Sequence, residues 1–126
     1  MGARRDDVAM RRWLLIAALL SAFPVAAAKK SSTPGQHGAI AYHRASQSWG
    51  VSTNKARARD ASVEALQYCG HKQCEVILKI KNGCGALADG PKAAVAVTGA
   101  TRDEAETKAV RRCGAGCTAI AWACTR

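Results

Sequence analysis

Short apolar runs occur in the same order twice along this chain. In the first half, the runs 39–42 (AIAY) and 49–53 (WGVST) are followed by an amphipathic stretch over 58–68 and by the run 74–81 (CEVILKIK). Alternation with a period of two predicts strands, and apolar side chains repeated at i and i+4 predict a helix. The pattern therefore predicts two strands joined by a polar connector, then a helix, then a third strand.

The third of these strands carries the strongest alternation. Val76, Leu78 and Ile80 are predicted to share one face, with the charged residues on the other face. Ile77 is the exception to this alternation.

The second half repeats the order. The runs 86–88 (ALA) and 93–98 (AAVAVT) predict two strands, and a further run ends at Cys124. Between them, Thr101 and Glu104 fit a capping box, in which the threonine oxygen accepts an N–H of the first helical turn and the glutamate reaches back. Acidic residues gather at the start of this predicted helix and Lys and Arg at its end, an arrangement that suits the helix dipole.

The cysteines mark the repeat. Sliding one half over the other by 44 residues places Cys-Gly at 69–70 on Cys-Gly at 113–114, and after one residue is lost in the turn Cys74 falls on Cys117. The sequence therefore predicts an α+β fold built from a duplicated ββαβ unit. It would contain two helices and about six short strands, stapled by disulfides.

The first 28 residues have the layout of a cleaved secretory signal. Arginines precede the apolar run 13–23 (WLLIAALLSAF), and the small residues 26–28 follow it. The run is shorter than the about 20 residues that a membrane span needs, although an uncleaved anchor is an alternative. We predict a signal peptide at 1–28, a disordered leader at 29–38 and a single domain at 39–126. The chain would be exported to the periplasm or the medium, with no integral membrane segment after cleavage.

All six cysteines lie in the predicted domain, which indicates a disulfide framework in an exported chain of this size. Each helix-end cysteine is followed closely by another at the start of a strand. Repeat symmetry therefore suggests two short-range pairs, Cys69–Cys74 and Cys113–Cys117. Cys84 and Cys124 remain, and we expect this third pair to join the two halves. Six cysteines allow many connectivities, so the pairing rests on symmetry.

Metal binding is an alternative for the first cysteine pair, because His71 lies within 69–74 (CGHKQC). Zinc sites mostly use C-x2-C or similar spacing, and this segment does not have it. The predicted export also favours oxidised cysteines. The sequence therefore predicts no metal site and no other cofactor.

Catalytic chemistry has little support in this sequence. Paired cysteines leave no thiolate nucleophile, and no G-x-S-x-G motif accompanies the three histidines. The segment 99–101 before the second helix lacks the remainder of a phosphate-binding loop. We predict that the protein is not an enzyme and has no catalytic residues, and we hold a hydrolase only as a third hypothesis.

The excess of basic residues points to anionic partners. Residues 29–126 hold 15 Lys and Arg against 7 Asp and Glu, which favours such partners through long-range attraction but can also serve solubility alone. We predict a basic binding face formed by Lys79 and Lys81 on one strand and by Arg111 and Arg112 at a helix end. The wider candidates for a basic patch are Lys55, Arg57, Arg59, Lys72 and Arg126. The few aromatic residues argue against nucleic acid, since single strands bind by stacking on aromatic side chains.

Several motifs occur together between residues 39 and 125. They are AIA at 39–41, Cys69-Gly70, Cys74, Asn82, CGALA at 84–88, GAT at 99–101, Cys113-Gly114, Cys117 and Cys124. Together they resemble the bacterial family called domain of unknown function 4189. The resemblance implies a small exported module with no established activity and no catalytic residues to carry over. The chain departs from the family pattern at Arg57, where a capping threonine is usual, and in 93–98, where aromatic residues usually alternate.

We therefore expect an exported, non-catalytic binding module that engages an anionic envelope polymer or an acidic protein through its basic face. The alternative is a small inhibitor or immunity-type protein that blocks a partner enzyme. A binder of charged polymer releases its partner at high salt because salt screens exposed charges, whereas an inhibitor copurifies with one stoichiometric protein.

Overall fold

The computed structural model describes residues 35–126. The predicted signal peptide at 1–28 and residues 29–34 of the predicted leader lie outside the described residues. The elements of the described part are, in chain order, β1 (His37–His43), β2 (Ser48–Lys55), α3 (Ala58–Cys69), β3 (Glu75–Lys81), β4 (Cys84–Asp89), β5 (Ala94–Gly99), α4 (Arg102–Cys113) and β6 (Thr118–Cys124). The predicted types of element and their order are confirmed.

The strands of this region form two three-stranded antiparallel sheets. Sheet A has the order β2-β1-β3, and sheet B has the order β5-β4-β6. Each half of the chain builds one sheet, with the first strand of that half in the middle. The predicted α+β fold of a duplicated ββαβ unit is therefore confirmed, and each copy of the unit forms its own sheet.

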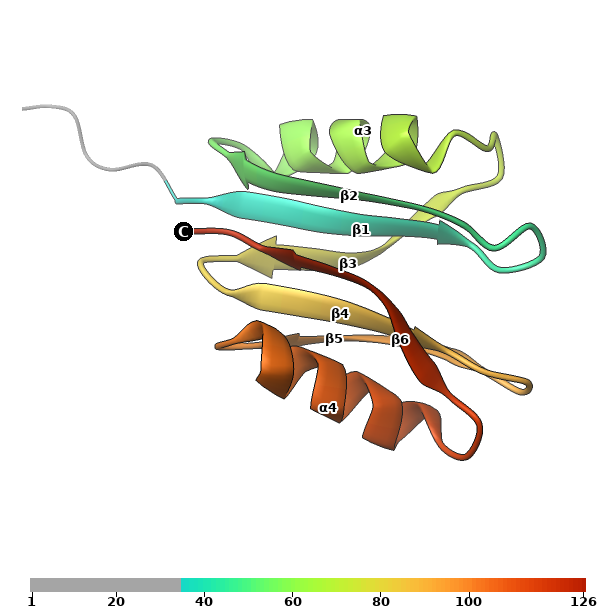
Figure 1. Cartoon of the computed structure of the whole chain (residues 1–126). Helices are drawn as coiled ribbons and strands as arrows, with labels where there is room; N and C mark the ends of the chain where they lie inside the picture. The colour runs from blue at the N-terminus through green and yellow to red at the C-terminus, as the bar shows by residue number, and fades with distance from the viewer. Residues whose placement is uncertain (1–34) are drawn as a thin grey trace, which may run out of the picture. The chain divides into compact units, whose positions relative to one another are not determined.

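The two sheets lie against each other, and each helix covers the outer face of its own sheet (Figure 1). Helix α3 packs mainly on β1 and β2, and helix α4 packs mainly on β4 and β5. Across the sandwich, β2 lies next to β6, and β3 lies next to β5. The layers follow one another in the order α3, sheet A, sheet B, α4.

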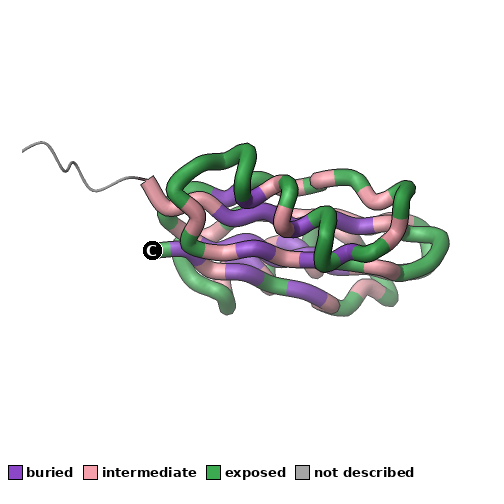
Figure 2. The backbone as a smooth tube through the Cα atoms, turned by 90° about the horizontal axis from the view of Figure 1, so that it is seen from above, coloured by how far each residue is buried: buried purple, intermediate pink, exposed green. Residues whose placement is uncertain are grey.

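Buried side chains form three clusters between these layers. The central cluster lies between the sheets and includes Ile40, Tyr42 and Ile80. The two outer clusters lie beneath the helices and consist mostly of alanine, such as Ala39 and Ala41 beneath α3. Alternate residues of a strand face opposite sides, so β1 supplies large side chains to the centre and small ones to the helix. Figure 2 shows that the buried segments lie along the strands, while the turns at both ends are exposed.

Small residues let the helices approach the sheets closely. On α3, Ala61 and Ala65 are fully buried against sheet A. In β2 beneath them, a Cβ atom at Gly50 would lie 2.2 Å from the carbonyl oxygen of Ala65, so this position needs glycine. The neighbouring Ser52 donates a hydrogen bond of 2.6 Å to the carbonyl oxygen of Ala61. An alanine-rich core can therefore still be closely packed.

A β-bulge changes the predicted faces of β3. The pairing of β3 with β1 shifts by one residue at Ile77. Leu78 and Ile80 pack in the central cluster, whereas Val76 packs beneath α3. The prediction that these three side chains share one face was wrong, because an extra residue in a strand reverses the alternation that follows it. Strand β6 has the same shift at Ile120.

Strand β1 begins at His37, two residues before the predicted start of the domain at 39. The residue before it is also held in place: the Asn82 N–H donates to the Gln36 carbonyl oxygen, and the Gln36 N–H donates to Oδ1 of Asn82, each at 3.0 Å. The predicted leader at 29–38 therefore extended too far into the fold. Its polar composition does not reveal that its last residues pair with β3 through backbone hydrogen bonds.

The disulfides of the structure are the predicted pairs Cys69–Cys74, Cys84–Cys124 and Cys113–Cys117. The two short-range bonds each connect the end of a helix to the region where the next strand begins. Cys84 and Cys124 face each other on β4 and β6, with Cα atoms 4.0 Å apart. Both strands belong to sheet B, so the expectation that this bond joins the two halves was wrong. It ties the last strand to the middle strand of its own sheet.

Candidate functional site

The end of the sandwich that carries the C-terminus brings several chain segments together (Figure 1). The Thr125 N–H donates to the Gly83 carbonyl oxygen at 2.7 Å, and the Thr125 hydroxyl donates to the Gln36 carbonyl oxygen at 2.8 Å. The Arg126 N–H donates to Oδ1 of Asn54 at 3.0 Å. These bonds hold the start of β1, the end of β2, the β3–β4 turn and the chain end next to one another.

Basic side chains surround this end of the sandwich. Those that are exposed and form no ion pair within residues 35–126 are Arg57, Arg59, Lys79, Lys81 and Arg126. We call these five residues the basic end. They come from the start of α3, the last residues of β3 and the chain end, so the fold collects charges that are far apart in sequence.

Helix α3 adds positive potential to the basic end. Its N-cap residue, Arg57, makes no side-chain capping bond, and Asp60 is the acidic residue of its first turn. In α4, by contrast, Thr101 accepts from the Glu104 N–H, and Glu104 accepts from the Ala100 N–H, each at 3.1 Å, which confirms the predicted capping box. The first-turn N–H groups of α3 lack such an acceptor and carry the positive end of the helix dipole.

A further lysine near this end is already paired. Nζ of Lys55, the last residue of β2, lies 2.9 Å from Oε2 of Glu64 on α3. The hydrogen bond to Glu64, together with its negative charge, raises the pKa of Lys55. The Glu64 carboxylate is therefore paired with Lys55, and it forms no ion pair with the five residues of the basic end.

The structure brings together only half of the predicted basic face. Lys79 and Lys81 lie at the basic end. They point to the outer side of sheet A, because their neighbours Leu78 and Ile80 point inward and pack in the central cluster. Arg111 and Arg112 lie in the last turn of α4, on the outer side of sheet B and at the opposite end of the sandwich. The prediction of one common face was therefore wrong. The face left out Arg57, Arg59 and Arg126, which were only among the wider candidates for a basic patch; the position of Arg57 at an uncapped helix start was the available signal.

The opposite end of the sandwich holds paired and buried polar groups. Nε of Arg44 lies 3.4 Å from Oδ1 of Asp89, which links the β1–β2 turn to the end of β4. The nearby Tyr42 hydroxyl is buried and has no hydrogen-bond partner within residues 35–126. Burial raises the pKa of Tyr42, and the neighbouring Asp89 carboxylate raises it further. His43 and His71 stack with ring centroids 4.1 Å apart.

The described part of the chain forms neither a cluster of metal ligands nor a membrane-spanning helix. Within residues 35–126, no group of three or more His, Cys, Asp or Glu side chains is arranged to hold a metal ion. The cysteines on either side of His71 are joined to each other, so the alternative of a metal site there loses its sulfur ligands. In the same region, no helix has both the length and the apolar character that a membrane crossing requires.

Comparisons with known proteins agree with the extent of the fold. The family described as domain of unknown function DUF4189 matches residues 37–124. Among solved structures, the NMR structure of Rv1813c from Mycobacterium tuberculosis is similar, with 34% sequence identity and a TM-score of 0.57, over 71% of this chain and 74% of that chain. No curated protein matches the chain significantly. The matched region begins with the first residue of β1 and ends with the last residue of β6, so it coincides with the two ββαβ units.

Proposed function

The chain belongs to the DUF4189 family, and we propose that it is an exported, non-catalytic binding module that engages an anionic envelope polymer or an acidic protein. The basic end is the observation that carries this proposal. Its five Lys and Arg side chains form no ion pair within residues 35–126, and two of them, Arg57 and Arg59, lie at the uncapped start of α3.

The arrangement suits a partner with repeated negative charge. One exposed ion pair contributes only about 0–1 kcal/mol, so useful affinity needs several contacts at once. Lys79 and Lys81 lie two residues apart on the same side of β3, and Arg126 follows a strand that ends nearby. A polymer or an acidic protein surface contacts such a spread of charges together, whereas a small anion contacts one or two.

Export is part of the same proposal. Disulfides form and persist in oxidising compartments, and this domain has three. Residues 1–28 have the composition of a signal peptide. Both observations support a location in the periplasm or the medium, where anionic polymers and lipid headgroups are accessible.

Titration of the exported chain with a polyanion tests the proposal. Poly-glutamate and polygalacturonate are suitable probes, with binding measured by isothermal calorimetry at increasing salt. The screening length falls from about 10 Å at 0.1 M salt to about 3 Å at 1 M, so the affinity should fall steadily over this range. Binding that does not change with salt would contradict the electrostatic mechanism.

Two double variants with the same loss of charge locate the surface. Lys81→Gln/Arg126→Gln removes two charges from the basic end, and we expect about tenfold weaker binding from the loss of two exposed ion pairs. Lys92→Gln/Arg112→Gln removes two exposed charges elsewhere and should change the affinity by less than about twofold. Equal losses in the two variants would show that only net charge matters, and no binding to either probe would rule out the polymer version of the proposal.

A further inference from the structure

Strand β6 is an edge strand that lacks charged residues and proline, and its pairing with β4 is irregular at Ile120 alone. It spans Thr118–Cys124 (TAIAWAC). The edge strand β3, by contrast, carries Glu75, Lys79 and Lys81. Charges and proline on an edge discourage pairing between chains, so an uncharged edge remains open to it. Sheet B can therefore accept a further strand beside β6.

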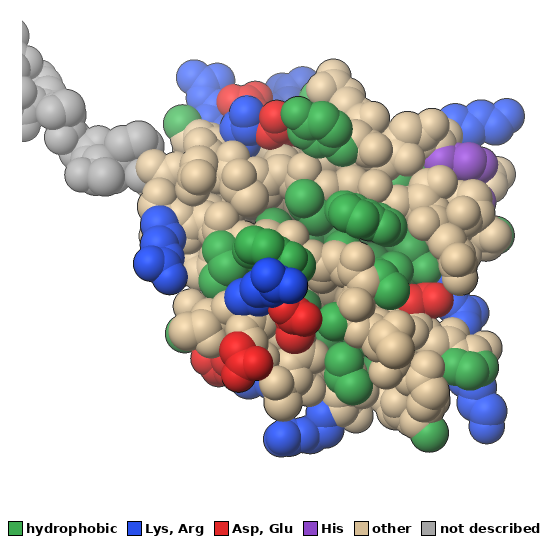
Figure 3. Space-filling view, viewed as in Figure 1, with side chains coloured by type: hydrophobic (Ala, Val, Ile, Leu, Met, Phe, Trp, Pro, Cys, Tyr) green, Lys and Arg blue, Asp and Glu red, His purple; other side chains and the backbone are tan. Residues whose placement is uncertain are grey.

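Exposed apolar side chains accompany this edge. Trp122 on β6 exposes 43% of its surface, and so does Trp49 on the adjacent β2. Figure 3 shows hydrophobic side chains gathered at the centre of this face, over β2 and β6, with a basic and an acidic side chain lying directly against them and further charged side chains around the margin. An apolar patch with a polar rim is typical of a protein–protein contact.

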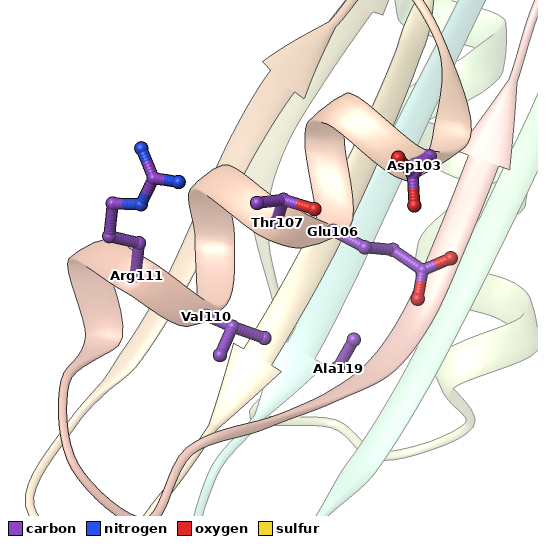
Figure 4. A pocket seen from close by; sticks show the side chains of 6 residues that line it. All are labelled: Asp103, Glu106, Thr107, Val110, Arg111 and Ala119. Atoms are coloured by element: carbon purple, nitrogen blue, oxygen red, sulfur yellow. The ribbon is translucent and has the colours of Figure 1, made fainter.

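A groove of about 440 Å³ runs between α4 and β6 (Figure 4). Asp103 and Glu106 line it towards the start of α4, and Arg111 lines it towards the end of that helix. Val110 and Ala119 supply its apolar part. The groove therefore has an acidic end and a basic end, with apolar surface between them.

Two charges of this groove have no partner. Glu106 pairs with Arg102, whose guanidinium carbon lies 4.1 Å from the ring centroid of Trp122. Asp103 and Arg111 form no ion pair within residues 35–126. They lie on one side of α4, separated along the helix axis by about 12 Å. The helix thus presents one free negative and one free positive charge at opposite ends of the groove.

Strand β6 runs beside helix α4 in the opposite direction. Trp122 lies beneath Arg102 at the start of α4, and Ala119 lies in the groove near the other end of the helix. The part of β6 between these two residues therefore lies beside the middle part of α4. A twofold axis at this point reverses the direction of β6 and exchanges the two ends of α4.

We propose that β6 pairs antiparallel with β6 of a second copy of this chain about such an axis. The two copies of sheet B then form one continuous sheet, and the exposed apolar edges cover each other. Asp103 of each copy faces Arg111 of the other, so both free charges gain a partner in one step. This is the self-complementarity that a twofold interface requires. The inference does not depend on the proposed anionic partner, because its charges are not those of the basic end.

Sedimentation equilibrium of the exported chain tests the inference. We expect a monomer–dimer equilibrium that depends on concentration. Asp103→Arg and Arg111→Asp each place like charges opposite one another twice in the dimer, and each should weaken it at least about tenfold. The double variant re-forms both pairs with reversed sign and should regain most of the affinity. Circular dichroism of each variant establishes that the fold is retained.

Arg112→Asp is the matched control. It makes the same change of charge in the same turn of α4, but Arg112 does not line the groove. We expect it to weaken the dimer by less than about twofold. A chain that stays monomeric at millimolar concentration overturns the inference. Equal effects of Arg111→Asp and Arg112→Asp, or no recovery in the double variant, also overturn it, and none of these results bears on polyanion binding at the basic end.

Discussion

Alanine in place of Gly50 should force α3 away from sheet A. Gly50 lies in β2 directly beneath the helix, and a Cβ atom there would be 2.2 Å from the Ala65 carbonyl oxygen and 2.3 Å from the Cys69 nitrogen. Both atoms belong to the helix backbone, so rotation of a side chain cannot relieve the overlap. The helix has to move outward by about 1 Å before these atoms reach ordinary contact distances.

The expected loss of stability follows from two opposing terms. Alanine in the interior of a strand is normally better than glycine by about 0.5–1 kcal/mol. Overpacking of a close contact costs about 1–3 kcal/mol, and here the displaced helix also loses contacts of the fully buried Ala61 and Ala65. We expect the cost of overpacking to exceed the gain from replacing glycine, with a net loss of about 2 kcal/mol in the free energy of unfolding. For a domain of this size, that lowers Tm by roughly 8–16 °C.

Thermal and urea unfolding, followed by circular dichroism with the disulfides intact, measures this loss. Amide hydrogen exchange then provides an internal control, because protection should fall in α3 and stay unchanged in α4. Gly50 has no positive φ, so backbone strain does not account for a loss. A Gly50→Ala variant as stable as the parent chain, or more stable, would refute the reasoning, since the backbone term alone predicts that sign.

Two further predictions concern the disulfides and the buried tyrosine. Cys84→Ser/Cys124→Ser should cost about 4 kcal/mol and Cys113→Ser/Cys117→Ser about 2 kcal/mol, because the sequence separations closed are 40 and 4. Urea unfolding measures both losses, and equal values would contradict the loop-length argument. The pKa of Tyr42 is raised in the fold by burial and by the adjacent carboxylate, so the unfolded chain loses this proton at a lower pH than the folded chain. Stability should therefore fall as the pH rises above about 10, as measured by chemical unfolding, and Tyr42→Phe should lose this dependence. An unchanged alkaline slope in that variant would show that other groups cause it.

The elements of the fold were predictable because their signals are local. Helix α4 has its capping threonine, its glutamate three residues later and its charged ends within one short segment. The short-range disulfides were also predictable, since a helix end and the following strand start are always close. The β-bulge at Ile77 was visible only as a break in the alternation, and its effect on Val76 depends on the pairing with β1. The residues of one strand do not show which other strand it pairs with.

The candidate surface was predictable in part. The sequence showed an excess of basic residues and placed Lys79 and Lys81 on one strand face. It did not show that Arg126 lies near them, because that depends on the bonds between the chain end, β2 and the β3–β4 turn. It also grouped Arg111 with the strand lysines, although the two sets lie on outer sides of different sheets.

By itself, the sequence determined the duplicated ββαβ order and the family resemblance and suggested the cysteine pairs, since periodicity and capping act over a few residues and the repeat relates the two halves by a fixed shift. Only the tertiary structure decided that each copy forms its own sheet and that Cys84–Cys124 closes sheet B. It also decided which basic side chains share one end of the sandwich. These properties depend on strand pairing and helix placement between residues far apart in the chain, and a local pattern of apolar and polar positions is compatible with more than one such arrangement.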